Sequence, residues 1–249
     1  MGDDVNILVV GGTGATGRHF VRKLLSHGCN VTIVVRNSDK IDTYFKDRER
    51  LTVILGKVLE IDFGTLRELV KDVDAIGSCL GHHMTFKGTF GEPKKLVTDS
   101  IQKLCQAVQD NDQNKPVRMV LMNTTGVRNK DIQEKWSLLE GIVFFITSNL
   151  VPQQSDNEQA TEYLRSYIGK NNKNIEWVIV RPDRLINEEE ITEYKILDST
   201  IRSPIFNGGT TSRINVGDFM CDLVVNSTKW NEWKGKMPVI YNISSIIAN

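Results

Sequence analysis

The sequence predicts an α/β protein with a doubly wound, parallel sheet of about seven strands. Short runs of β-branched residues alternate with segments of helical periodicity along the 249 residues, which is the pattern of βαβ units. The first two runs, residues 7–10 and 31–35, are apolar throughout, as expected of strands that are covered on both faces. We therefore expect the sheet to lie between two layers of helices.

Strands and helices are expected to alternate along the chain. The predicted strands are residues 6–10, 31–36, 52–55, 75–79, 118–122, 176–180 and 239–242. The predicted helices are, roughly, residues 15–27, 40–48, 63–70, 93–109, 156–169 and 216–227. In the fourth helix Val97, Ile101, Leu104 and Val108 recur at steps of three and four residues, which places them on one helical face.

The chain is expected to form one domain, residues 1–249. No internal repeat, low-complexity tract or linker rich in Pro, Gly and Ser divides it. Two long connections, residues 127–155 and 184–215, interrupt the strand rhythm in the C-terminal half. Ligands of open α/β sheets bind beyond the carboxyl ends of the strands, so we expect these insertions to build a substrate pocket.

Charge and composition argue against several classes of function. The 31 Lys and Arg residues are balanced by 31 Asp and Glu, which leaves no basic field for a nucleic acid. The longest apolar run, residues 141–151, is too short for a membrane span. The four cysteines show no CxxC spacing, and the first residues include no basic signal region, so a cytoplasmic protein with reduced thiols is expected.

A glycine-rich turn follows the first predicted strand and opens the first predicted helix. It reads Gly11-Gly-Thr-Gly-Ala-Thr-Gly17, with GxxGxxG rather than GxGxxG spacing. Glycine allows the tight turn and the close approach of the backbone to a pyrophosphate, whose charge the N–H groups of the helix N-terminus stabilise. In this context the turn predicts a dinucleotide site of the Rossmann type; the alternative is an incidental flexible turn.

The end of the second predicted strand indicates which dinucleotide is bound. An Asp or Glu here usually accepts a hydrogen bond from the ribose 2′-OH of NAD, whereas an Arg accommodates the 2′-phosphate of NADP. This chain has Arg36, whose guanidinium can form two parallel hydrogen bonds to a phosphate. We therefore expect NADPH, with Arg18 as a second candidate contact; the alternative is an exposed Arg that begins a loop.

With the turn, Arg18 and Val34-Val-Arg36, the sequence resembles the atypical short-chain dehydrogenase/reductase group of NAD(P)H-binding proteins. This group includes NmrA-like proteins and biliverdin-IX-beta/flavin reductases. Further matches at residues 74–81, 118–127, 177–182 and 213–219 extend the resemblance over nearly the whole chain. The cofactor contacts that it implies, together with those of the turn, are Gly11, Thr13, Gly14, Ala15, Thr16, Gly17, Arg36, Val58, Leu80, Gly81, Asn123 and Pro182.

The catalytic pair of the standard reductases in this superfamily is missing. Those members use a Ser or Thr hydroxyl together with a Tyr and a Lys that lie four residues apart on one helical face. None of the five tyrosines here has a Lys four residues later, and Ser155 and Gln159 occupy the two family positions. Biliverdin-IX-beta/flavin reductase-like members also lack the pair, so the resemblance still allows hydride transfer.

Two residues are candidates for catalysis. Thr124 stands at the family's hydroxyl position after the fifth strand, where it would bind a substrate carbonyl or the nicotinamide ribose; the alternative is a polar turn. His82 follows Cys79-Leu-Gly81 in a loop expected to pass the nicotinamide, where it could donate a proton, although a solvent-facing histidine is the more frequent case. It has no His-x₃-His partner or acidic cluster, so no metal site is expected.

Residues 136–146 are unusually apolar for a connection between strands. They could form a lid over an aromatic-substrate pocket, a dimer face or part of the core, and core packing is the commonest of these roles.

The predicted function is an NADPH-dependent oxidoreductase, active as a monomer or a homodimer. It would transfer hydride to a small-molecule acceptor, namely a flavin, a quinone or a small carbonyl compound, with the protein supplying orientation and electrostatics. The alternative, which the resemblance to NmrA-like proteins allows, is a sensor or regulatory scaffold that binds NADP(H) without turnover.

Overall fold

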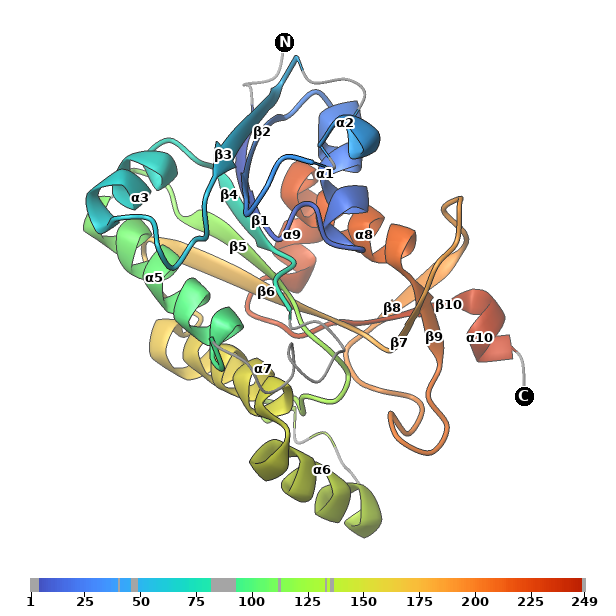
Figure 1. Ribbon diagram of the computed structural model, residues 1–249. Coiled ribbons are helices and arrows are strands. Elements are labelled where there is room, and N and C mark those ends of the chain that lie inside the picture. The colour runs from blue at the N-terminus through green and yellow to red at the C-terminus, as the bar shows by residue number, and fades with distance from the viewer. Residues whose placement is uncertain are drawn as a thin grey trace.

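The computed structural model describes residues 5–39, 41–45, 49–81, 93–111, 113–132, 134 and 137–247. An eight-stranded sheet runs through the centre of the molecule, with helices on both faces (Figure 1). The doubly wound α/β fold is thus confirmed, with one strand more than the seven predicted.

The strand order in the sheet is β3-β2-β1-β4-β5-β6-β10-β8. All neighbours are parallel except β10 and β8. The strands are β1 (Asn6–Val10), β2 (Asn30–Val35), β3 (Leu51–Leu55), β4 (Ala75–Ser78), β5 (Val117–Met122), β6 (Ile175–Pro182), β8 (Tyr194–Leu197) and β10 (Val239–Asn242). The chain builds outward from β1 to β3 and then returns to build from β4, so the order reverses between β1 and β4. Sheets of this kind bind dinucleotides at such a switch point.

Three helices cover one face of the sheet: α1 (Gly17–Ser26), α8 (Arg213–Val225) and α9 (Ser227–Trp233). Their buried residues, such as Phe20, Phe219 and Trp230, form one hydrophobic cluster with the strands. Helix α8 packs closely on α1 because residue 217 is a glycine. A Cβ on Gly217 would lie only 2.7 Å from the backbone nitrogen of Phe20.

The opposite face is covered by α3 (Phe63–Val70), α5 (Leu96–Asn111), α7 (Pro152–Glu162) and a π-helical continuation of α7 (Tyr163–Ile168). Asp156 of α7 is fully buried. Its carboxylate oxygens accept hydrogen bonds from the backbone N–H groups of Val97 and Thr98, at 2.8 Å each. This carboxylate therefore caps the start of α5 and joins the two helices.

The two predicted insertions contain more regular structure than expected. Residues 127–155 include α6 (Leu138–Leu150) and the first turn of α7, and residues 184–215 include β7 (Arg184–Ile186), β8 and β9 (Thr210–Ser212). Strands β7 and β9 pair with each other in a small second sheet. The chain also forms α2 (Ile41–Tyr44) after β2 and α10 (Ile243–Ile247) after β10.

Helix α5 begins at Leu96, three residues later than predicted, whereas capping chemistry starts two other helices earlier than predicted. Helix α7 begins at Pro152 rather than at residue 156, since proline suits the first helical position. Helix α8 begins at Arg213 rather than at residue 216, because the Ser212 side chain accepts a hydrogen bond from the Asn215 N–H and forms the N-cap.

A buried ion pair joins both insertions to the sheet. Arg181 on β6 and Glu134 lie 2.7 Å apart, and their side chains are 0% and 3% exposed. Arg181 also donates to the carbonyl oxygen of Val127, and Glu134 accepts from the backbone N–H groups of Asn129 and Thr200. Burial opposes the charge of Glu134, but the hydrogen bonds and charge of Arg181 hold the pKa of this carboxyl below its usual range.

Removing one partner of this pair should destabilise the fold strongly. We expect Glu134→Gln or Arg181→Met alone to lower the free energy of unfolding by about 3–5 kcal/mol, because each leaves an unpaired buried group. The double variant should lose less than the sum of the two costs. Glu60→Gln, in the exposed pair with Lys57, is the control and should cost less than about 1 kcal/mol. Urea unfolding measures all four variants, and additive costs would contradict the coupling.

The same pair should make stability depend on pH in the acid range. The pKa of Glu134 is lower in the folded than in the unfolded chain, so its contribution is present above the unfolded value of about 4.3. That contribution is lost as the pH falls through the folded value. Wild type should therefore lose stability on acidification more steeply than Glu134→Gln, as followed by thermal unfolding at a series of pH values.

Candidate functional site

The glycine-rich turn lies at the switch point of the sheet. Gly11, directly after β1, has a φ of +77°. A Cβ on Gly11 would lie 2.6 Å from the carbonyl carbon of Cys79 and 2.8 Å from the backbone nitrogen of Leu80. Only glycine permits this contact between the turn after β1 and the segment after β4. Both segments lie at the carboxyl edge of the parallel strands, where this fold binds its dinucleotide.

Two more glycines shape the start of α1. The N–H of Gly14 donates to the carbonyl oxygen of Gly11 at 3.0 Å, and a Cβ on Gly17 would lie on top of the same oxygen. Thr16 is the N-cap residue of α1, but its side chain makes no capping hydrogen bond. The N–H groups of Arg18 and His19 in the first turn donate to the carbonyl oxygens of Gly14 and Thr16, at 3.1 and 2.9 Å, and Gly14 and Ala15 just before the helix are exposed. This cradle fits the pyrophosphate of a dinucleotide.

Arginine side chains gather near this turn. Arg36 follows β2, the parallel neighbour of β1, and is exposed at the same edge of the sheet. The Arg18 guanidinium lies 5.3 Å from the centre of the Tyr44 ring, and Arg22 Nε donates to the Tyr44 carbonyl oxygen at 2.6 Å. Burial and the charges of Arg18 and Arg22 lower the pKa of His19 to about 4. The imidazole is therefore neutral at pH 7, and the positive charge of this region comes from arginines, which suit a phosphate.

The remaining predicted cofactor contacts differ in their surroundings. Val58, after β3, is buried in the hydrophobic cluster beneath α3 and α5. Leu80 and Gly81 follow β4, and Pro182 ends β6. Asn123, directly after β5, uses its side-chain amide in two hydrogen bonds to α7, at 2.8 and 3.0 Å, which fasten the strand to that helix. The contact of these five residues with a cofactor stays a prediction.

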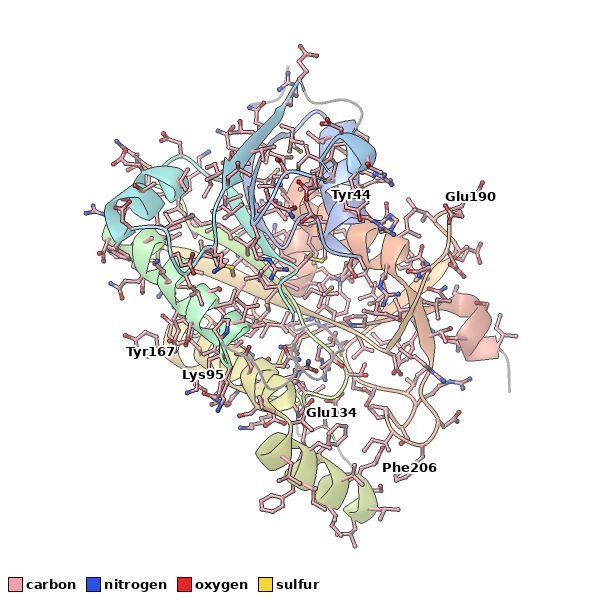
Figure 2. All side chains as sticks on the ribbon, in the orientation of Figure 1. Tyr44, Lys95, Glu134, Tyr167, Glu190 and Phe206 are labelled. Atoms are coloured by element: carbon pink, nitrogen blue, oxygen red, sulfur yellow. The ribbon has the colours of Figure 1, made fainter. Side chains whose placement is uncertain are left out.

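A pocket of about 580 Å³ lies beyond the carboxyl ends of β5 and β6. Its wall consists of residues 124–126 after β5, residues 183–184 after β6, Phe144 of α6, Gln154 of α7 and residues 204–208. Both predicted insertions thus contribute to it. Glu134 and Phe206, which belong to these insertions, are labelled in Figure 2 in the lower part of the molecule.

Thr124, one of the two predicted catalytic residues, lies in this pocket. Its Oγ1 accepts a hydrogen bond from the N–H of Gly126 at 3.2 Å, so the hydroxyl group keeps its own hydrogen to donate. The other predicted residue, His82, lies outside the described residues.

Asp183 is the site residue that sequence reasoning missed. It directly follows β6, lines the pocket and is 8% exposed. The N–H groups of Arg184 and Gly209 donate to its two carboxylate oxygens at 2.9 Å each, and the Thr125 side chain forms a third hydrogen bond. Burial nevertheless raises the pKa of Asp183 above its usual range. One feature of the sequence could have indicated Asp183: it is an acid that shortly follows a predicted strand whose carboxyl end borders the predicted pocket.

The two positions of the missing Tyr and Lys lie one turn apart on α7. Gln159 Nε2 donates to Ser155 Oγ at 2.8 Å. A hydroxyl and an amide do not exchange protons near neutral pH, so this pair cannot act as Tyr and Lys do. Any proton needed for catalysis has to come from another group.

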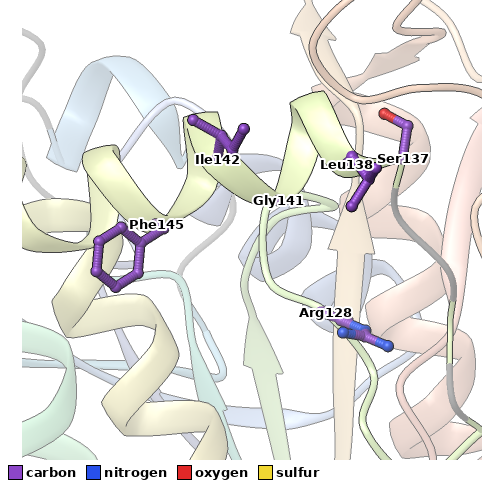
Figure 3. Close-up of a pocket in the computed structure, with 6 residues that line it drawn as sticks. All are labelled: Arg128, Ser137, Leu138, Gly141, Ile142 and Phe145. Carbon is purple, nitrogen blue, oxygen red and sulfur yellow. The ribbon is translucent and has the colours of Figure 1, made fainter.

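The expectation that the apolar residues 136–146 pack on the core is wrong for most of α6. Phe144 is buried and lines the pocket. Large apolar side chains that are 48–91% exposed cover the rest of the helix: Leu138, Leu139, Ile142, Phe145, Ile146 and Leu150. A hollow of about 400 Å³ lies beside Gly141, between α6 and Arg128. Figure 3 shows the residues that line it. Apolar residues lie around most of the circumference of α6, but only one face of the helix is buried, so the others remain exposed.

The described residues contain no group of three or more His, Cys, Asp or Glu side chains placed to hold a metal ion. The four cysteines are free and buried, and burial raises the pKa of the Cys79 thiol to about 12. Within the described ranges, none of the helices combines the length and the apolarity that a membrane crossing requires.

Comparisons with known proteins match this geometry. A family model described as NAD(P)H-binding matches residues 11–227. The structure of a short-chain dehydrogenase/reductase from Veillonella parvula in complex with NADP is similar, with a TM-score of 0.68, 19% identity and coverage of 97% of this chain and 96% of that one. An oxidoreductase from Lactococcus lactis gives a TM-score of 0.66 at 18% identity, over 96% of this chain and 91% of its own.

Two reductases are also similar. The structure of a candidate NADH-flavin reductase from Streptococcus pneumoniae covers 96% of this chain and 99% of its own, with a TM-score of 0.66 and 15% identity. Divinyl chlorophyllide a 8-vinyl-reductase of Arabidopsis thaliana, a chloroplast protein, is 35% identical over 86 residues, which are 31% of this chain and 20% of that protein. The match therefore spans only a fifth of this relative.

The family match extends from the glycine turn through α8 and covers most of the chain. The protein belongs to the NAD(P)H-binding family.

Proposed function

We propose that the protein is an NADPH-dependent oxidoreductase that transfers hydride to a small molecule in the pocket beyond β5 and β6. The observation that carries this proposal is the placement of two sites along one edge of the sheet. The glycine turn contacts the segment after β4, and the pocket begins at Thr124, after the neighbouring strand β5. A dinucleotide whose pyrophosphate lies on α1 and which crosses the switch point would extend toward this pocket.

The chain offers distinct groups for each part of the cofactor. The N–H groups at the start of α1 would bind the pyrophosphate, and Arg36, with Arg18 as a second contact, would bind the 2′-phosphate. Leu80, Gly81, Asn123 and Pro182 follow or end the strands that the nicotinamide half would pass. When bound, the nicotinamide supplies the hydride. The protein holds its face against the acceptor and excludes water.

The acceptor pocket combines a polar and an apolar wall. Thr124 and Thr125 stand on the side of the sheet, while Phe144 and Phe206 come from the two insertions. Such a pocket suits a small molecule with a flat or apolar body and a polar group, which the Thr124 hydroxyl would orient. Flavins, quinones and small carbonyl compounds have this chemistry, and the names of two relatives, a vinyl-reductase and a candidate flavin reductase, support a reductive reaction.

The alternative function is an NADP(H)-binding sensor without turnover. Two observations favour it: the neutral hydrogen bond between Ser155 and Gln159 at the Tyr and Lys positions, and the exposed apolar side chains of α6, which a partner would cover. Binding of NADPH with no turnover on any acceptor would support this alternative against the first proposal.

Cofactor preference tests the role of Arg36. We expect wild type to bind NADPH more tightly than NADH, and Arg36→Asp to weaken NADPH binding by about 10- to 100-fold while NADH binding changes little. The reason is that the carboxylate replaces a charge-assisted hydrogen bond with repulsion. Lys229→Asp, which places the same charge change on exposed α9, is the matched control. Calorimetric titration measures each affinity, and equal affinities of wild type for the two cofactors would rule out a 2′-phosphate site.

Turnover tests the role of Thr124. Wild type should oxidise NADPH, followed by the loss of its absorbance, with at least one member of a panel of flavins, quinones, aldehydes and dicarbonyls. Thr124→Val should lower kcat/KM by about 5- to 10-fold, because one hydrogen bond to the acceptor is lost. Thr228→Val, on the exposed side of α9, is the control and should change nothing. Unchanged turnover in Thr124→Val would remove this hydroxyl from the site.

A further inference from the structure

The acceptor pocket contains a buried carboxyl group that the hydride transfer described above does not use. Asp183 lines the pocket together with Thr124 and Thr125, and only 8% of its surface is exposed. Among the described residues of the pocket wall it is the only acid, and this wall contains no His, Lys, Cys or Tyr. A proton that a side chain delivers inside this pocket would therefore come from Asp183.

The hydrogen bonds of Asp183 suit a group that loses and regains a proton. The N–H groups of Arg184 and Gly209 and the Thr125 side chain stabilise the carboxylate that remains after proton transfer. The two carboxylate oxygens have about four lone-pair sites, so three partners leave room for a ligand atom. Burial raises the pKa of Asp183, which keeps the proton on this carboxyl at higher pH than on an ordinary Asp.

Few charged or titratable groups face Asp183. Arg184 lowers its pKa through its charge, and the Arg184 guanidinium also donates to the Gly208 carbonyl oxygen at 3.0 Å. Tyr241, on β10, is neutral at pH 7, because burial and the charge of Asp183 raise its pKa to about 12. Helices α6 and α7 present the uncharged Phe144 and Gln154. Asp183 is therefore the acid among these groups that can give a proton to a ligand in the pocket.

We propose that Asp183 is the proton donor for the reduction of an aldehyde or ketone in this pocket. This inference rests on the proposed oxidoreductase function and narrows its acceptor to a carbonyl compound. A carbonyl acceptor needs a proton on its oxygen as the hydride arrives. Flavins and quinones depend less on a proton donor in the protein. An acid in the pocket therefore supplies what the Ser155 and Gln159 pair cannot.

The step balances in atoms and electrons. The hydride pair forms a C–H bond at the carbonyl carbon, and the π pair of the C=O bond moves to the oxygen. This oxygen then takes the proton of the Asp183 carboxyl, while the Thr124 hydroxyl holds it by a hydrogen bond. The products are an alcohol and the oxidised dinucleotide. Asp183 regains its proton from solvent once the alcohol has left.

The decisive variant is Asp183→Asn, which keeps the size of the side chain and removes its proton. We expect kcat with an aldehyde or ketone to fall by about 10²- to 10⁴-fold, while the affinity for NADPH changes by less than about threefold. Asp183→Glu, which restores a carboxyl group, should recover part of the rate. Asp198→Asn, the same substitution at an exposed site, is the matched control. Carbonyl turnover that survives in Asp183→Asn would overturn the proposal.

The pH dependence has a definite sign. The protonated acid is the reactive form, so kcat/KM of wild type for the carbonyl compound should fall as the pH rises through the pKa of Asp183. The residual rate of Asp183→Asn should be flat over the same range. If both proteins show the same profile, the titrating group is not Asp183.

A measurement without cofactor or turnover tests the same carboxyl. In infrared difference spectra, the carbonyl band of a protonated carboxylic acid should be present in wild type and absent in Asp183→Asn. When this band is followed as a function of pH, the midpoint of its titration should lie above about 3.9, the ordinary pKa of Asp. A midpoint at or below that value would overturn the proposal even if both proteins reduce carbonyl compounds.

The acceptor panel separates this inference from the proposed function. Wild type that reduces flavins or quinones but no aldehyde or ketone would overturn the role of Asp183 and leave the oxidoreductase standing. Wild type that binds NADPH and reduces nothing would overturn both. Reduction of a carbonyl compound, with loss of rate in Asp183→Asn and partial recovery in Asp183→Glu, would support both.

Discussion

The buried ion pair between Arg181 and Glu134 joins both insertions to the sheet beside the pocket. Two buried charges are stable only when they are paired with each other. Here backbone groups of both insertions also form hydrogen bonds to the pair. Residues 124–126 precede Val127, whose carbonyl binds Arg181, and Asp183 follows Arg181 by two residues. The same ion pair therefore fixes the two polar walls of the pocket. Burial of its two charges costs desolvation energy, and the hydrogen bonds around them favour one arrangement of these segments.

The two halves of the site differ in the charge of the groups around them. Near the glycine turn the arginines supply positive charge, and His19 adds none because their charges and burial keep it neutral. In the pocket, burial favours the neutral form of Asp183. A negatively charged phosphate suits the first environment, and an uncharged acceptor suits the second. This contrast would orient an elongated ligand along the edge of the sheet.

Sequence reasoning predicted the parts of the structure that depend on local chemistry. The turn at Gly11, the apolar strands and the absence of a Tyr and Lys pair could all be recognised, because glycine conformation, burial on both faces and helical spacing leave marks in a single sequence. Asp183 and Glu134 could not be assigned in the same way. Their properties come from burial and from partners distant in the sequence, such as Gly209 and Thr200, which only the fold brings close.

The apolar segment before α7 shows the limit of pattern reading most clearly. Its hydrophobicity predicted burial, yet its length and position leave only one side of α6 in contact with the molecule, mainly through Phe144. Which residues of a helix are buried depends on the elements that pack beside it, and the composition of the helix does not show those neighbours.

Helix α6 also affects how the molecule responds to heat and denaturant. Its outer side chains meet water in the folded state, so unfolding adds little to their hydration, and they contribute little to the heat capacity change or to the dependence of stability on urea. The helix is held by Phe144 and by the hydrogen bonds from Ser203 to Glu140 and from Ser148 to Glu158. Detachment of α6 alone would thus be a small, local opening that uncovers one wall of the pocket, and its frequency would be nearly independent of denaturant while the sheet stays intact.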